Sequence, residues 1–385
     1  MIFHFIILVI SFIFIFYLVK NIDFQKKINI INLKESIINK ISENNYIEYI
    51  KSPKIKTFTI LSYNILSQRF MKRKEIKSLS LEIRIPKIIN EINKENPDIF
   101  CLQESTFDVY QKYFSKSFND YEIIKYDNEG SYLMNLIGIR KNRFTLLNEC
   151  KFDLSNKIID INGNRGVINV KIKDNLYKDK IISLFCVHFP WKPIYEYQKA
   201  RILLMIFEFI LQNKNENIII SGDFNSIPNS IPLRMIYYQD FINEFNENKD
   251  YIGDFVFNKN EINLMKEVKQ KMKKRENFKN TINKIFEISK LVYEKYLLRS
   301  VYDEYKINEN NKNNLKFNYL RNHPDYTNYT KTFINTIDYI IYSKFLEKVK
   351  IKKIPIINND YLPNENYPSD HLKLFAEFQY SKIKK

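Results

Sequence analysis

Four short segments of the chain end in side chains that can hold a divalent metal or move a proton. The segments ILSYN, IFCLQE, IIISGDFNSIP and YPSDH carry Asn64, Glu104, Asp223 with Asn225, and Asp370 with His371. Asp338 lies within a further apolar run, and His188 ends another. The chain has only four histidines. Two of them end or follow such apolar runs, which is more than chance would be expected to give. Apolar runs that stop on carboxylates, amides and imidazoles are typical of an α/β enzyme with a polar site at one edge of its sheets.

The carboxylates in this set are hard oxygen ligands of the kind that Mg²⁺ or Mn²⁺ prefers. Phosphodiester cleavage needs an activated water and neutralisation of the phosphate charge, and a divalent ion would supply the second. We therefore expect a metal site formed by Glu104, Asp223 and Asp370. Asn64 and Asn225 can hydrogen-bond a phosphate oxygen or the attacking water without adding negative charge.

The two histidines of the set are candidates for proton transfer or phosphate contact. His371 is a candidate general base, and a histidine in that role is often oriented by a carboxylate on its other nitrogen. We expect Asp338 to be that partner and His188 to contact charge that develops on the phosphate. Taken alone, an Asp-His pair is usually a loop and a histidine after a strand is usually a core residue. The ordered set as a whole favours catalysis.

The apolar pattern predicts strands that alternate with helices and a chain that ends on strands, which suits two packed sheets with helices outside. Helices are expected around 85–96 and 203–211. Strands are expected at 56–64, 98–103, 131–140, 166–173, 180–187, 217–220, 336–342 and 372–378. Gly222 suits a sharp turn after a strand, because glycine has no Cβ.

Composition limits the possible classes of protein without choosing among them. A chain of 385 residues with 45% hydrophobic content can bury a full core. The net charge of +17 attracts polyanions, although Lys, Asn and Ile are abundant along the whole chain, so we discount this charge as evidence of function. The three cysteines, Cys101, Cys150 and Cys186, have no spacing that indicates a disulfide framework or a zinc site.

Residues 1–20 form a predicted transmembrane or signal-anchor segment, because the run 2–19 is almost wholly apolar and carries no charge. A cleaved signal peptide is the alternative. The lysines that follow the run predict a cytosolic catalytic domain, with the secretory pathway or an organelle as the other possibility. Residues 21–55 are a predicted spacer. The catalytic domain is expected at 56–380, with a Lys/Asn-rich helical insertion at about 237–314.

The ordered motifs resemble the endonuclease/exonuclease/phosphatase superfamily. Finer features, among them LSYNILSQ and YTNYT followed by IDYI, are similar to its deadenylase-like branch, which includes nocturnin, Angel and 2′-phosphodiesterase relatives. The resemblance implies a four-layered α/β sandwich, of the deoxyribonuclease-I-like kind, and Mg²⁺-dependent phosphoester hydrolysis. It also implies that Glu104 is the principal metal ligand and that Asp223 and Asn225 handle the nucleophile and the phosphate.

By the same resemblance, Asp338 supports His371 and His188 contacts the scissile phosphate. Substrate-binding roles are expected for Asn64, Trp191, Pro193, Tyr326 and Asn328. For Trp191 and Tyr326, plain core packing is an equally good interpretation of the sequence. Leu66 stands where relatives that cut abasic DNA carry an acidic residue, which argues against that repair activity.

Three functions stay open on the sequence. The first is a Mg²⁺-dependent nuclease or phosphodiesterase that acts on RNA 3′ ends or on nucleotides. The second is a membrane-associated lipid phosphoesterase of the same fold, and the third is an inactive scaffold. No obligate protein partner is expected, and nothing resembles the leucine-rich repeats of the largest cytoplasmic deadenylases.

Overall fold

The computed structural model describes residues 57–71, 79–126, 133–152, 154, 166–177, 179–192, 195–238, 251–252, 255–256, 278–303, 323–357 and 360–382. The chain divides into two units between residues 56 and 57, and all described residues belong to the second. The predicted anchor at 1–20 and the predicted spacer at 21–55 lie outside the described residues. Within the described part of the chain, no helix is both long and apolar enough to cross a membrane.

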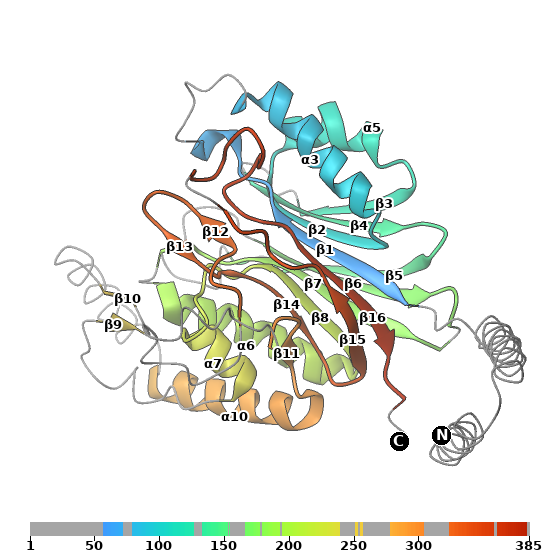
Figure 1. Cartoon of the computed structure of the whole chain (residues 1–385). Helices are drawn as coiled ribbons and strands as arrows, with labels where there is room; N and C mark the ends of the chain where they lie inside the picture. The colour runs from blue at the N-terminus through green and yellow to red at the C-terminus, as the bar shows by residue number, and fades with distance from the viewer. Residues whose placement is uncertain are drawn as a thin grey trace, which may run out of the picture. The chain divides into compact units, whose positions relative to one another are not determined.

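Two six-stranded mixed sheets form the centre of the second unit (Figure 1). In each sheet the central pair is parallel, β1 with β2 and β7 with β8, and the other neighbours are antiparallel. The first sheet has the order β15 (Leu346–Ile351), β16 (Leu374–Tyr380), β1 (Phe58–Asn64), β2 (Ile99–Ser105), β4 (Met134–Arg140) and β3 (Tyr121–Tyr126). The second has the order β11 (Arg299–Ser300), β14 (Asp338–Tyr342), β8 (Asn217–Asp223), β7 (Ile181–His188), β6 (Val167–Asp174) and β5 (Phe144–Phe152).

Helices cover the outer face of each sheet (Figure 1). On the first sheet lie α3 (Leu81–Glu95), α4 (Phe107–Val109), the π-helical turn η3 (Tyr110–Phe114) and α5 (Ser115–Ser117). On the second lie α6 (Glu196–Asn213), α7 (Ile231–Tyr237) and α10 (Phe278–Tyr296). Short elements complete the described chain: the 3₁₀ turn η1 (Gln68–Phe70) and the two-stranded ladders of β9 (Tyr251–Ile252) with β10 (Phe255–Val256) and β12 (Asn328–Tyr329) with β13 (Ile334–Asn335).

Three separate apolar layers hold these elements together. The middle layer joins the inner faces of the two sheets, with Phe58 and Ile219 among its fully buried members. A second layer lies between the first sheet and α3, and a third between the second sheet and its three helices. Three cores require four layers of secondary structure, so the predicted four-layered α/β sandwich is confirmed.

The sequence predicted the inner strands and missed the outer ones. All eight predicted strands are present, whereas β15, β3, β11 and β5, which form the edges of the two sheets, were not predicted. An edge strand has a neighbour on one side only and intersperses charged with apolar side chains, as in LEKVKI of β15. Such a segment lacks the continuous apolar run that indicates a buried strand.

The predicted insertion at 237–314 falls largely outside the described residues. Its described helix, α10, packs into the outer helical layer through Ile282, Ile285, Val292 and Tyr296, all of them buried. This part of the segment therefore contributes to the core of the second unit.

Candidate active site

The ends of the central strands bring the predicted polar residues to one edge of the two sheets. In the first sheet, Asn64 on β1 pairs in register with Gln103, the residue before Glu104 on β2. In the second sheet, Asp223 on β8 pairs with His188 on β7 at one side and with Asp338 on β14 at the other. Parallel strands end at the same edge of a sheet, and the antiparallel β14 begins there, so within each sheet the register places these residues at one edge.

Gly222 allows β7 and β8 to approach where the site begins. A Cβ at this position would lie 2.0 Å from the carbonyl oxygen of Val187, and the φ of +144° is one that side chains rarely adopt. The glycine that the sequence indicated for a turn therefore serves a close strand contact one residue before Asp223.

Asn64 links the two sheets through its side chain. Its Nδ2 donates to Asp223 Oδ2 at 2.9 Å and to Glu104 Oε1 at 3.2 Å. Its Oδ1 accepts from the amide of Leu66 at 3.0 Å. The amide that was predicted to bind substrate is thus engaged within the site and sets the spacing of two carboxylates.

Asp223 accepts hydrogen bonds at both carboxylate oxygens. Besides Asn64, the Asn225 main-chain N–H donates to Oδ1 at 2.7 Å and the Asn225 Nδ2 donates to Oδ2 at 3.1 Å. His188 Nε2 lies 3.6 Å from Asp223 Oδ2 and 3.8 Å from Glu104 Oε1. Asp223 therefore lies at the centre of the predicted set.

Glu104 has a strained backbone that aims its carboxylate into the site. Its φ is +62°, which is uncommon for a residue with a Cβ and typical of functional positions. Its Oε2 accepts from the Ser67 amide at 2.9 Å, and its side chain is 13% exposed. One carboxylate oxygen is thus fixed by the loop after β1, and the other by Asn64.

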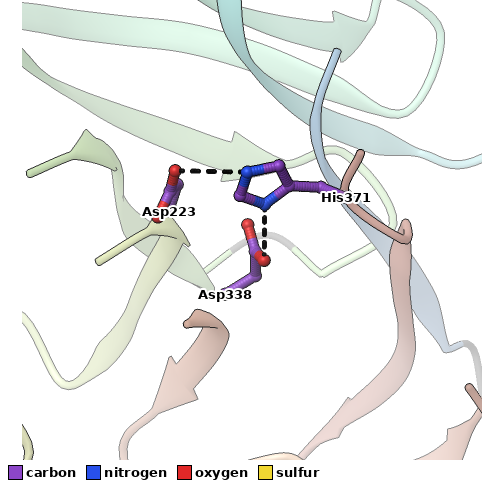
Figure 2. Close-up of side chains that lie close together, drawn as sticks. All are labelled: Asp223, Asp338 and His371. Atoms are coloured by element: carbon purple, nitrogen blue, oxygen red, sulfur yellow. Dashed lines mark hydrogen bonds and ion pairs between the residues drawn. The ribbon is translucent and has the colours of Figure 1, made fainter. Parts of the chain in front are cut away.

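His371 and Asp338 form a hydrogen-bonded pair (Figure 2). The His371 Nδ1 lies 2.9 Å from Asp338 Oδ2, and Thr327 Oγ1 donates to the same carboxylate oxygen at 2.6 Å. The other ring nitrogen, Nε2, lies 3.9 Å from Asp223 Oδ2 and 3.9 Å from Asp370 Oδ1. The geometry of a carboxylate that orients an imidazole, as predicted, is present.

The carboxylates of Glu104 and Asp370 fit a divalent cation better than the compact group of Asp223, Asp338 and His371 does. The three residues of that group offer ligand atoms within 4.8 Å of one another, but those atoms already hydrogen-bond to one another and to neighbouring donors. In contrast, Asp370 Oδ1 is buried and has no hydrogen-bond partner among the described residues. An orphaned carboxylate oxygen near a second carboxylate is a site that a hard cation would satisfy.

The electrostatics of the site reflect crowded negative charge. Burial and the Asp338 carboxylate raise the pKa of Asp223 to about 7. Burial and the Asp370 carboxylate raise the pKa of Glu104. Burial alone would lower the pKa of His371, but the carboxylates of Asp338, Asp370 and Asp223 outweigh it and hold that pKa well above its usual value.

The stability of the metal-free chain should fall between about pH 5 and about pH 8. A group whose pKa is raised by folding contributes stability in full below its unfolded pKa, and that stability is lost as the pH rises through the folded pKa. For Asp223 this window runs from about 4, the unfolded value, to about 7, and His371 adds a loss of the same sign that begins near 6.5. We expect scanning calorimetry in a chelator to show a melting temperature several degrees lower at the higher pH.

The variant Asp223→Asn tests the source of this pH dependence. It cannot ionise, so the fall in melting temperature should be smaller than in the parent chain. An equal fall would contradict the role of Asp223 in the pH dependence.

Arg84 is a site residue that sequence reasoning missed. It is fully buried on α3, and its guanidinium donates to the carbonyls of Ile65 (2.8 Å), Leu66 (2.6 Å) and Pro368 (2.7 Å). It therefore ties the loop after β1 to the loop that carries Asp370 and His371. The sequence did contain an indication that Arg84 is buried, because position 84 lies one turn from Ile88 on the apolar face of the helix.

The predicted substrate-binding residues have different surroundings. Trp191 is 60% exposed, which excludes core packing. Tyr326 is half-buried, and its hydroxyl donates to Pro355 O at 3.2 Å and accepts from the Ile357 amide at 2.8 Å, as a packing residue does. Asn328 is buried and bridges the backbone of His371. Pro193 lies outside the described residues.

The sequence profile of the Endonuclease/Exonuclease/phosphatase family matches residues 61–371. Among curated proteins, the chain is 24% identical to the "Probable CCR4-Not complex 3'-5'-exoribonuclease subunit Ccr4" of Enterocytozoon bieneusi, with 86% of this chain and 66% of that protein covered. It is also 24% identical to the "CCR4-Not complex 3'-5'-exoribonuclease subunit Ccr4" of Schizosaccharomyces pombe, with 84% and 49% covered. The chain thus spans about two thirds or less of the length of these relatives.

Solved structures share the fold. The crystal structure of ANGEL2, a 2′,3′-cyclic phosphatase in complex with adenosine-2′,3′-vanadate, has a TM-score of 0.60 at 19% identity, with 84% of this chain and 96% of that chain covered. The human Nocturnin catalytic domain with bound sulfate has a TM-score of 0.53 at 20% identity, with 84% and 95% covered. The profile match therefore confirms the predicted family, the curated relatives are similar to its deadenylase-like branch, and the solved structures confirm the fold.

Proposed function

Because the chain belongs to the endonuclease/exonuclease/phosphatase family, we propose that it hydrolyses phosphodiester bonds at RNA 3′ ends, as a deadenylase-like ribonuclease that uses Mg²⁺ or Mn²⁺. The observation that carries the proposal is the pair of hydrogen bonds by which Asn64 joins Glu104 of one sheet to Asp223 of the other, beside the His371–Asp338 pair. The substrate follows the two relatives, whose names describe 3′-5′ exoribonuclease subunits.

Glu104 and Asp370 are the residues that would hold the cation, whereas Asp223, the third predicted ligand, has both carboxylate oxygens hydrogen-bonded to neighbouring donors. When bound, a divalent cation supplies charge neutralisation for the phosphate and for the leaving oxygen. The buried Asp370 Oδ1 without a hydrogen-bond partner supports this assignment. The raised pKa of Glu104, which burial and Asp370 cause, reflects the repulsion that a cation would relieve.

The remaining side chains position and transfer protons. Asp223 accepts a proton from the attacking water, and Asn225 holds the Asp223 carboxylate through its main-chain and side-chain donors. His371 presents Nε2 to the phosphate, because Asp338 fixes its Nδ1. His188, with Nε2 at 3.6 Å from Asp223, lies where it contacts charge that develops on the same phosphate.

The base at the 3′ end would lie beside Trp191, with Pro193 and Asn328 as the other substrate-binding residues. Exposed aromatic faces stack on bases with little sequence preference, at about 1–3 kcal/mol per base, and the 60% exposure of Trp191 suits that role. The excess positive charge of the chain would assist the approach of a polyanion.

We also propose that the apolar run at 2–19 attaches the chain to a membrane, with the catalytic domain on the cytosolic side. The proposal rests on the sequence of this run and on the lysines that follow it.

A panel of substrates tests the activity. The purified chain would be incubated with Mg²⁺ and a 5′-labelled RNA with an adenosine tail, the same RNA ending in a 2′,3′-cyclic phosphate, and sphingomyelin vesicles. We expect stepwise shortening of the first RNA from its 3′ end, abolished by a chelator. Loss of the cyclic phosphate without shortening would indicate a phosphatase instead. Turnover of lipid alone, or of nothing, would contradict the proposal.

A further inference from the structure

Helix α6 carries an ion pair that is closed off from solvent beneath the active site. The side chains of Lys199 and Glu196 are both 0% exposed, and the Lys199 Nζ lies 2.7 Å from Glu196 Oε1. Lysine and glutamate are almost never fully buried unless they are paired. Neither residue contributes to the proposed chemistry, so their burial calls for another explanation.

Both members of the pair reach from α6 to the loop that follows Asp223. The Lys199 Nζ donates to the main-chain carbonyl of Asn225 at 2.5 Å. The Glu196 Oε2 accepts from the main-chain amide of Ile231, the first residue of α7, at 3.2 Å. The pair therefore fixes the loop at two points.

Asn225 is a residue whose conformation needs such support. Its φ is +47°, in the left-handed region that costs energy for a residue with a Cβ. Its amide and its side chain both contact Asp223, and its Nδ2 also donates to Phe189 O at 3.0 Å. The carbonyl that Lys199 binds belongs to the same residue, so this bond helps to hold Asn225 in the left-handed conformation in which both donors meet Asp223.

We propose that Lys199, held in place by Glu196, is a positioning residue that fixes the Asn225 backbone so that the Asn225 side chain and amide hold the Asp223 carboxylate. The consequence for turnover rests on the proposed function, whereas the consequence for the loop does not. A purely structural role explains the pair poorly, because replacing a buried ion pair with well-packed apolar side chains is often neutral or stabilising.

The double variant Glu196→Gln with Lys199→Met removes both charges and the donor to Asn225. Its glutamine can still accept from the Ile231 amide. We expect kcat on 3′-ended RNA to fall about 10- to 100-fold, as for the loss of outer-shell partners in other sites, while KM changes little. We also expect faster hydrogen–deuterium exchange in a peptide that covers 223–230, because the Asn225 amide loses its fixed bond to Asp223.

A matched control removes an ion pair at the opposite end of the strands. Arg143 lies 2.8 Å from Asp174, with side chains 10% and 0% exposed, and Asp174 ends β6 far from His188 on the neighbouring β7. The double variant Arg143→Met with Asp174→Asn should lower the melting temperature and leave both kcat and exchange at 223–230 unchanged.

The readouts separate failure of this inference from failure of the proposed function. If the parent chain hydrolyses no RNA, the proposed function fails, and the exchange of 223–230 still decides whether the pair positions the loop. If kcat and exchange of the α6 variant match those of the control variant, the positioning role is wrong. Should the α6 variant not fold, Glu196→Gln with Lys199→Gln keeps a hydrogen-bonded neutral pair and is measured with the same two readouts.

Discussion

Replacement of His371 by alanine is expected to lower kcat on 3′-ended RNA by about 10²- to 10³-fold, the usual cost of losing one positioned donor that stabilises charge in the transition state, with the chain still folded. The reason is geometric. Asp338 fixes the ring through Nδ1 at 2.9 Å, so that Nε2 lies 3.9 Å from Asp223 in the centre of the site. Steady-state kinetics together with a thermal melting curve measure both parts of the expectation.

His323 supplies the control for the loss of a buried imidazole. Both histidines are 5% exposed, and the His323 ring lies against Tyr339, with ring centroids 5.6 Å apart. The variant His323→Ala should cost stability and leave kcat near that of the parent. Asp338→Asn should lower kcat less than His371→Ala does, because the imidazole remains. A near-parental rate for His371→Ala would overturn the role given to that side chain.

The sequence predicted the convergence of several candidate side chains because four of them lie at the ends of buried strands in the central pairs. The order of strands along the chain does not state which strands are neighbours, but Asn64, Glu104, His188 and Asp223 all end strands that the apolar pattern marks as buried. Such strands lie in the middle of sheets, and the ends of parallel neighbours meet at one edge. The site could therefore be predicted without knowledge of the full topology.

The residues that sequence reasoning missed hold the loops that carry the site residues. Arg84 and Lys199 are charged side chains on the apolar faces of helices. In the sequence, each interrupts the spacing of apolar residues and gives no indication of a function. The structural role of each side chain depends on the backbone carbonyls to which it donates, and these carbonyls come from loops distant in sequence. The positive φ values of Glu104 and Asn225 are likewise set by these tertiary contacts. Periodicity along one segment carries no information on such contacts.

The sequence also could not distinguish substrate-binding residues from packing residues, as Tyr326 illustrates. Aromatic residues near the site were equally compatible with base stacking and with packing. The Tyr326 hydroxyl is engaged with the segment at 355–357, whereas Trp191 is largely exposed. Only the position of each ring relative to solvent separates the two interpretations.

Replacement of Glu104 by glutamine is expected to change activity and metal-free stability in opposite directions. Loss of a cation ligand removes several kcal/mol of charge stabilisation in the transition state, which corresponds to about a 10²- to 10⁴-fold loss in kcat/KM. In the absence of metal, the neutral side chain relieves the repulsion from Asp370 that, after burial, raises the pKa of Glu104. The metal-free variant should therefore melt at a higher temperature than the parent near pH 8.

Addition of Mg²⁺ or Mn²⁺ supplies the decisive comparison for Glu104. A cation that binds only the folded chain stabilises it in proportion to its occupancy, so the parent should gain melting temperature and Glu104→Gln should gain far less. Asp98 lies just before the opposite end of β2 and accepts from the Thr59 amide at 2.9 Å, so Asp98→Asn removes a comparable anchored carboxylate. It should lower stability and keep the full gain from metal. An equal gain in Glu104→Gln would show that the cation binds without Glu104, and the ligand set proposed for this family member would then be wrong.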